Sequence, residues 1–443
     1  MSSTNLFIIL NLFICINAFN KIKANENNPK NVYVSKKPNG YSLIVEGKEY
    51  YIKGAGGHTN LKRLKAIGGN SIRTWSATGA QSILDSAYKN GLTVTLGIEM
   101  SLERQGFSYN DKNKVKDQFE RIKREINQFK NHPALLIWGI GNELELNTNN
   151  YKIWDAVEEI ASYIHINDKN HPVTTMLAGV PQNHIKEIKK RCQSIDILSI
   201  NAFKDIPYVK TKLIKSGWTG PYMITEWGTD GYWESELTSW GAFIEPTSSQ
   251  KAEQYRNRYK LHISPSENCL GSYVFYWGYK QERTHTVFSI FIEKNLETEA
   301  ISVLHEIWKG NKEKNTPPKI DQIKINNGSI AKNIILEPNK EYYLSINATD
   351  NDNDMISYSW EIYFESNERK AGGDKEIKPP QINCCIKNKN KSGTSFVTPE
   401  VEGPYRIFVY AYDEKNHIAT ANLQILIKKE NKINQKKQVK KQK

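Results

Sequence analysis

The stretch LLIWGIGNE, residues 135–143, begins as an uninterrupted apolar run and ends in Asn142 and Glu143. A short apolar run of this kind is typical of a fully buried β-strand. The segment MITEWG, residues 223–228, has the same form and places Glu226 near the end of its own run. Both segments therefore predict a buried strand that delivers a carboxylate at its carboxyl end.

Short apolar runs alternate with helical patterns on both sides of these segments, between residues 32 and 310. The helical patterns include Lys112–Lys130, Tyr151–His165 and Ser248–Ile263. Eight alternations over this length predict an α/β fold, a (β/α)8 barrel. A doubly wound sheet is the alternative, but no Gly-rich phosphate loop follows the first run. The eight apolar runs are Tyr50–Gly54, Asn70–Trp75, Leu92–Ile98, Leu135–Gly141, Val173–Leu177, Ile195–Asn201, Tyr222–Trp227 and Ser272–Trp277.

The composition changes after the predicted barrel. Residues 311–318 are polar and end in a Pro-Pro pair, which predicts a linker. Residues 319–428 lose the helical period and contain short strand-like segments separated by turn residues, which predicts an all-β sandwich. Those segments are Ile334–Leu336, Tyr342–Asn347, Ile356–Ile362, Tyr405–Tyr412 and Thr420–Ile427.

Both ends of the chain read as segments outside the folded domains. Leu6–Phe19 is apolar but too short to cross a bilayer, so residues 1–24 are predicted to be a signal peptide and the protein to be secreted or periplasmic. No later stretch predicts a membrane span. Residues 429–443 form a Lys-rich tail without apolar periodicity, which predicts disorder.

The net charge of +13 invites a nucleic-acid interpretation, but its location argues against one. Residues 428–443 hold eight Lys and one Glu, so more than half of the excess charge lies at the C-terminus. We therefore expect no nucleic-acid partner. The tail could attach the protein electrostatically to an anionic surface, or it could simply be solvated.

Two carboxylates at strand ends indicate a specific chemistry. Glu143 ends the fourth predicted strand and Glu226 the seventh, and the carboxyl ends of barrel strands form the active-site face. A carboxyl group desolvated at a strand end has a raised pKa, which suits a general acid. A pair of this kind can cleave glycosidic bonds with retention of configuration. Asn142 is expected to bind a sugar hydroxyl, and Asn201, at the end of the sixth strand, to face the same cleft.

This chemistry requires no metal or organic cofactor. The run from Asp350 to Asp354 could bind Ca²⁺, but no Glu follows at the spacing of a calcium loop, so a polar turn is the favoured interpretation. The Cys residues fit neither a zinc motif nor a disulfide scaffold. The expected partner is a poly- or oligosaccharide substrate.

The region from about Val45 to Trp308 resembles the barrel domain of glycoside hydrolase family 2. The segments that carry the resemblance are Tyr51–Gly54, Gly69–Trp75, His132–Glu143, Thr225–Gly228 and Tyr276–Trp277. The resemblance implies that Glu143 is the acid/base and Glu226 the nucleophile. It also implies that Arg73 hydrogen-bonds the nucleophile and that Trp277 lines the sugar subsite.

The resemblance has limits that leave other functions open. Family members usually carry a jelly-roll and an Ig-like domain before the barrel, and the stretch before Tyr51 is too short for either. The chain is also similar to fungal-type β-1,3-glucanosyltransferases, so transglycosylation by the same two Glu is an alternative, as is a non-catalytic carbohydrate-binding protein. The segment from Ala348 to Trp360 resembles polycystic-kidney-disease-type or Ig-like modules.

Two residues near the predicted site also have alternative roles. Glu145 could exchange roles with Glu143 if the strand ended two residues later. Trp233 lies in the long loop after the seventh strand, where it could stack on a sugar or pack within the loop.

Overall fold

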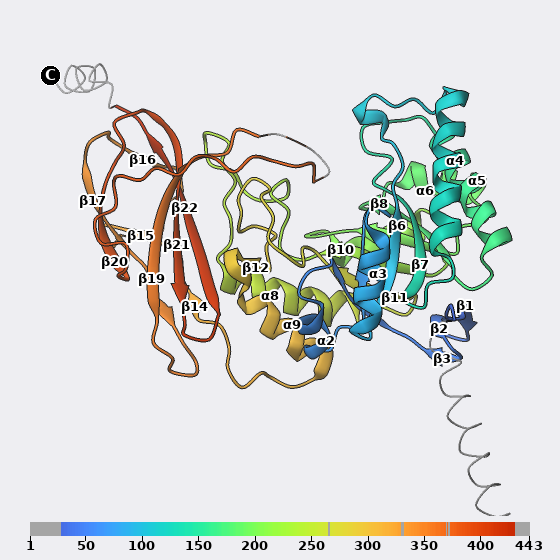
Figure 1. The fold of residues 1–443 in the computed structure, drawn as a ribbon. Coiled ribbons are helices and arrows are strands. Elements are labelled where there is room, and N and C mark those ends of the chain that lie inside the picture. Colours follow the sequence, from blue (N-terminus) through green and yellow to red (C-terminus); the bar gives the residue numbers. More distant parts are fainter. Residues whose placement is uncertain (1–27, 265, 329–331, 369, 371–372, 430–443) are drawn as a thin grey trace, which may run out of the picture.

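The computed structural model describes residues 28–264, 266–328, 332–368, 370 and 373–429 (Figure 1). The signal peptide predicted over residues 1–24 lies outside the described residues, as does the basic tail from residue 430 onward. No helix within the described ranges is long and apolar enough to cross a membrane.

Eight parallel strands close into a barrel, in the order β10-β11-β4-β5-β6-β7-β8-β9. The prediction of a (β/α)8 barrel followed by an all-β region is therefore confirmed. Glu143 directly follows the fourth barrel strand, and Glu226 lies near the end of the seventh. The strands are β4 (Ile52–Gly56), β5 (Ser71–Arg73), β6 (Thr93–Ile98), β7 (Leu135–Asn142), β8 (Val173–Ala178), β9 (Ile197–Asn201), β10 (Tyr222–Trp227) and β11 (Cys269–Val274).

The eighth strand begins and ends three residues earlier than predicted. The apolar run does continue to Trp277, but its last residues pack beyond the sheet. Phe275 N–H donates to Trp227 O (2.7 Å) and Trp277 N–H donates to Gly56 O (2.9 Å), so this stretch continues irregularly between the neighbouring strand ends. Hydrophobicity alone cannot distinguish such a buried extension from the strand itself.

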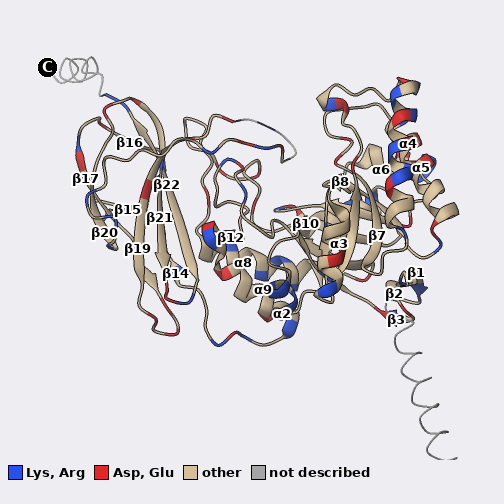
Figure 2. Cartoon of the chain, in the orientation of Figure 1, with Lys and Arg blue, Asp and Glu red and all other residues tan. Residues whose placement is uncertain are grey.

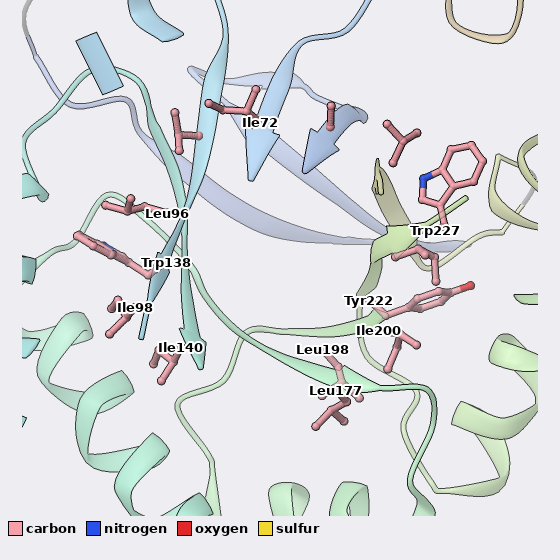
Figure 3. Packing of buried hydrophobic residues seen from close by; sticks show 14 of the residues in the cluster. Ile72, Leu96, Ile98, Trp138, Ile140, Leu177, Leu198, Ile200, Tyr222 and Trp227 are labelled. Carbon is pink, nitrogen blue, oxygen red and sulfur yellow. The ribbon is translucent and has the colours of Figure 1, made fainter. Parts of the chain in front are cut away.

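Helices surround the barrel, and their ends follow local sequence signals. Asp111 caps α4 by accepting from the backbone of Asn113 and Lys114, and Thr247 with Gln250 forms a capping box on α8. Strand side chains such as Leu96 and Trp138 pack in the shared core (Figure 3). The helices are α2 (Leu61–Ala66), α3 (Ala80–Lys89), α4 (Lys112–Phe129), α5 (Lys152–Asn167), α6 (Gln182–Arg191), α7 (Val209–Lys215), α8 (Ser248–Arg258) and α9 (Glu299–Lys309).

A small antiparallel sheet lies at the amino-terminal end of the barrel. It consists of β1 (Val32–Lys37), β2 (Gly40–Val45) and β3 (Lys48–Glu49). Val32 and Leu43 pack in one cluster with Leu136 and Ile197, which stand near the beginnings of their barrel strands. This end of the barrel is therefore covered with apolar side chains, while the carboxyl ends of the strands open at the opposite end.

The C-terminal region is built of strands, as the sequence predicts, with a core around Trp360, Phe396 and Ile407. One sheet has the order β15-β17-β20 and the other β16-β22-β21-β19, with a separate β14–β18 pair. The strands are β14 (Lys319–Ile320), β15 (Lys324–Ile325), β16 (Ile334–Leu336), β17 (Glu341–Ser345), β18 (Ala348–Thr349), β19 (Ser357–Phe364), β20 (Gly393–Val397), β21 (Gly403–Tyr412) and β22 (Ile418–Ile427).

The C-terminal sheets pack directly against loops of the barrel. Arg406 on β21 forms a buried ion pair with Glu365 (2.8 Å) and donates to Phe243 O in the loop after β10 (2.9 Å). His285, in the loop after β11, bonds Tyr410 OH (2.7 Å). Charged side chains gather on outer helices such as α4 (Figure 2). The interface also holds charged pairs, such as Arg406 with Glu365 and Lys378 with Glu293.

Candidate active site

An open cleft of about 1340 Å³ lies at the carboxyl ends of the barrel strands. Four of the predicted site residues line it, namely Asn142, Glu143, Asn201 and Glu226. They come from β7, β9 and β10 and the residue that follows β7, which are far apart in the sequence. The barrel therefore brings the two strand-end carboxylates into one cleft.

Glu226 is buried beneath the cleft and is held by two N–H donors. Arg73, whose side chain is fully buried at the end of β5, donates from Nη1 to Glu226 Oε1 (2.9 Å). The indole N–H of Trp75 donates to the same oxygen, also at 2.9 Å. A guanidinium and an indole donor thus bind the same oxygen of this carboxylate and fix its orientation.

Hydrogen bonds through two amides connect the two carboxylates. Arg73 Nη2 donates to Asn142 Oδ1 (2.5 Å), and Asn201 Nδ2 donates to Asn142 Oδ1 (3.1 Å) and to Glu143 Oε1 (2.9 Å). Thr225 Oγ1 fixes the orientation of Asn201 by donating to its Oδ1 (2.8 Å). Asn142 and Asn201 thus link Arg73 to Glu143 by hydrogen bonds. Of the two amides, Asn201 contacts Glu143 directly.

Glu143 sits in a different environment from Glu226. Its backbone has φ of 50°, in the left-handed region, and follows Gly141, which has φ of 68°. The β7–β8 register shifts between Gly139 and Asn142, so the strand ends in a sharp change of direction. Burial, and secondarily the negative charge of Glu226, raise the pKa of Glu143 to about 7. This carboxyl group therefore keeps its proton to a much higher pH than an ordinary glutamic acid does.

Glu145 does not share the position of Glu143. Its buried side chain accepts from the backbone N–H of Ala178 (2.6 Å), and it is absent from the residues that line the cleft. Burial raises the pKa of Glu145 to about 8. Of these two carboxylates, only Glu143 faces the cleft together with Glu226.

The expectation that Trp277 lines the cleft is corrected by the structure. Its ring is fully buried, its indole N–H donates to Thr59 O (2.8 Å), and it packs edge-on against Phe291. The cleft wall is formed by its neighbours Phe275 and Tyr276 instead. The predicted eighth strand ends three residues later than β11 does. Trp277 therefore lies behind the residues that line the cleft.

Sequence reasoning missed Trp75 as a site residue, although it follows the second strand two residues after Arg73. The sequence signal for Trp75 is a side chain with an N–H donor just beyond the end of a barrel strand. Trp233, in the loop after β10, also lines the cleft and is 56% exposed, with its ring edge-on to Phe203 at 5.3 Å. It thus offers an accessible aromatic surface.

Among the described residues, one group of carboxylates has metal-ligand spacing. Asp350, Asp354 and Asp413 bring carboxylate oxygens within 4.8 Å of one another. Asp350 Oδ1 accepts from the backbone of Asp352 (2.8 Å) and Asp354 (3.1 Å), a turn arrangement of the kind favoured from the sequence. None of these residues lines the cleft.

A family model matches part of the barrel. Residues 58–259 match the family model described as glycosyl hydrolases family 2, TIM barrel domain. This part of the barrel is therefore similar to the TIM barrel domain of glycosyl hydrolases family 2. The match extends over the strands that carry Arg73, Glu143 and Glu226. No curated protein matches the chain.

Three solved structures are similar to this chain at low sequence identity. An FMN-binding β-glucuronidase from Facaelibacterium prausnitzii L2-6 is 14% identical with a TM-score of 0.50, over 90% of this chain and 59% of that one. A β-glucuronidase from Ruminococcus gnavus is 16% identical with a TM-score of 0.48, over 63% and 52% of the two chains. An endo-β-1,4-mannanase from Thermotoga petrophila is 11% identical with a TM-score of 0.43, over 87% and 99%. This chain thus spans between half and three fifths of the length of the two glucuronidases.

Proposed function

We propose that this protein is a retaining glycoside hydrolase that cleaves a β-linked poly- or oligosaccharide. The observation that carries the proposal is the unequal pair of carboxylates in one cleft. Glu226 accepts two N–H donors, one of them the Arg73 guanidinium, while the raised pKa of Glu143 keeps its proton available. Different surroundings of this kind allow one carboxyl to act as acid and the other as nucleophile.

In the first step, Glu143 donates its proton to the glycosidic oxygen as the bond to the anomeric carbon breaks. The Glu226 carboxylate attacks that carbon and forms a covalent glycosyl ester. Arg73 and Trp75 hold one Glu226 oxygen, which fixes the orientation of the carboxylate. The leaving saccharide departs with the proton from Glu143.

In the second step, the ionised Glu143 removes a proton from water, and the resulting oxygen nucleophile displaces Glu226 from the anomeric carbon. Two displacements at the same carbon restore its original configuration. Asn201 contacts Glu143 Oε1 and can stabilise the carboxylate while it is ionised.

The test compares the protein with its Glu226→Ala variant on a panel of β-linked polysaccharides and oligosaccharides. We expect the native protein to shorten at least one member and the variant to leave every member intact. Unchanged cleavage by the variant would overturn the assignment. Product lengths also distinguish hydrolysis from transglycosylation, because transfer yields products longer than the starting oligosaccharide.

Location in an exported compartment is part of the proposal and depends on residues 1–24. Fusing these residues to a reporter enzyme and measuring its export tests this part separately. Retention of the reporter inside the cell would contradict it.

A further inference from the structure

The rim of the cleft includes residues from the C-terminal β region. Gly373 and Asp374 lie between β19 and β20 in the sequence, yet they line the same cleft as Glu143 and Glu226. The cleft is therefore formed by two parts of the chain, and its outer wall is not made by the barrel alone.

Polar contacts hold this wall to the barrel from two sides. On one side, Gln105 Nε2 in the loop after β6 donates to Asp374 Oδ1 (3.2 Å). On the other side, Lys280 Nζ in the loop after β11 donates to Gly373 O (3.1 Å). The backbone N–H of Arg283 in the same loop donates to Glu376 Oε2 (2.5 Å). The segment 373–376 thus connects loops that follow two non-adjacent barrel strands.

The order of the barrel strands shows which side of the cleft this segment covers. The strands β4 and β5 lie between β11 and β6. The loops that follow them are short, because α2 begins at Leu61 and α3 at Ala80. The segment 373–376 contacts the loops after β11 and β6. It therefore covers the side of the cleft where the loops of the barrel itself are short.

The seam between the two parts carries groups that can bind a ligand. Lys280 pairs with Glu282, which is buried, and its ammonium lies 5.3 Å from the centre of the Phe275 ring. Among the described residues, Glu282 and Gly373 O accept two of the three N–H donors of Lys280, which leaves one donor for a ligand. The Asp374 carboxylate is half-buried, and within the described part of the chain its hydrogen bonds are the long ones from Gln105, which leaves acceptor capacity.

We propose that this seam is a second sugar-binding subsite, in which Lys280 and Asp374 bind hydroxyl groups of a sugar unit beyond the one attacked at Glu226. The proposal rests on the proposed glycosidase function. It places the unit bound at the seam outside the two units joined by the cleaved bond, so the substrate has at least three units. The charges at the seam are mixed and largely paired, and the neighbouring rings of Phe275 and Tyr276 are apolar surfaces. This combination suits a neutral, hydroxyl-rich sugar rather than an anionic one.

The test measures how the Asp374→Ala variant depends on substrate length. The probes are β-linked gluco-, manno- and galacto-oligosaccharides of two to six units, with affinity measured by calorimetry and kcat/KM measured for every oligosaccharide that is cleaved. For the longest oligosaccharides that bind, we expect the variant to lose on the order of tenfold in affinity and in kcat/KM. For the dimer of the same series, we expect a change of less than about twofold.

Two further variants make the result specific. Gln105→Ala alters the same wall from the barrel side and should give a smaller loss with the same length dependence. Glu400→Ala removes an exposed carboxylate of the β region that does not line the cleft, and it should change nothing.

Equal losses at all lengths, no loss at any length, or no binding of any oligosaccharide would overturn the subsite. Length-dependent affinity without any cleavage would support the subsite while contradicting the proposed hydrolase function, so the two proposals fail separately.

Discussion

Glu143 and Glu226 carry the same functional group, and their surroundings give them different chemistry. Glu226 accepts hydrogen bonds from Arg73 and Trp75. Glu143 accepts a hydrogen bond from the neutral amide of Asn201 and is desolvated. An ion-pairing donor favours the charged form of a carboxyl group, and burial disfavours it. The proposed division of labour therefore follows from the neighbours of each carboxylate.

Removing the proton carried by Glu143 should separate its role from that of Glu145. We expect Glu143→Gln to lower kcat/KM on an unactivated substrate by about 10²–10⁴-fold, because the amide cannot donate a proton to the leaving oxygen. The matched variant Glu145→Gln removes a buried carboxyl that lies outside the cleft, and it should retain native turnover. Steady-state rates of the two variants measure this. The opposite pattern would exchange the roles of these residues.

The raised pKa of Glu143 predicts a pH dependence with a definite sign. The acid form is required, and because its pKa lies at about 7 instead of the ordinary 4.5, kcat/KM should hold up to near neutral pH and fall above it. A pH profile of kcat/KM between pH 4 and 9 tests this. A decline centred near 4.5 would contradict the environment described for Glu143. The residual activity of Glu143→Gln should lack the alkaline decline.

At the scale of elements, the hydrophobic pattern of the sequence best predicts the long, strongly apolar strands and helices. All eight barrel strands overlap their predicted ranges, and so do the helices α4, α5 and α8. In the β region, β14, β15 and β18 are two residues each, too short for alternation to be visible. Their pairing depends on contacts with distant strands, which a local pattern does not contain.

The site was predictable where it depends on strand ends and not where it depends on loops. Glu143, Glu226, Arg73, Asn142 and Asn201 meet because parallel strands end on one face. The sequence misplaces Trp277 because its apolar run continues past the end of β11 at Val274. The contribution of Asp374 could not be foreseen, since it depends on the packing of the C-terminal sheets against barrel loops.

Trp75, two residues beyond the end of β5, supplies a donor whose removal should lower activity and leave the fold intact. We expect Trp75→Phe to reduce kcat/KM on the order of tenfold, because the ring is largely kept while Glu226 loses one of its two N–H donors. The matched variant Trp154→Phe removes the buried indole donor to His184 outside the cleft, and it should alter the melting temperature without reducing kcat/KM. Equal kinetic effects of the two variants would argue against a role for Trp75.

At the scale of the whole molecule, the C-terminal sheets support the loops that shape the cleft. Lys251 and Glu245 form a fully buried pair that Thr284 and Thr286 also contact, which connects the loops after β10 and β11. Arg406 and His285 connect the same loops to β21. The sheets thus stabilise the loops on the side of the barrel where the further subsite lies.

Breaking the buried pair at this interface should destabilise the protein. We expect Arg406→Ala to lower the free energy of unfolding by about 3–5 kcal/mol, because Glu365 would remain buried without its counter-charge. Urea denaturation measures the loss. The exposed pair of Lys332 and Glu236 is the control, and Lys332→Ala should cost about 0–1 kcal/mol. Similar values for the two variants would contradict the structural role given to Arg406.

The central claim is that Glu226 forms a covalent link to the sugar, and the stereochemistry of the first product tests it most directly. Proton NMR of a cleaved β-linked oligosaccharide, recorded within the first turnovers, reports the configuration of the new anomeric centre before it equilibrates. Two displacements predict a β-anomer, with no product from Glu226→Ala. An initial α-anomer would mean that water attacks the sugar directly and would contradict the covalent role of Glu226.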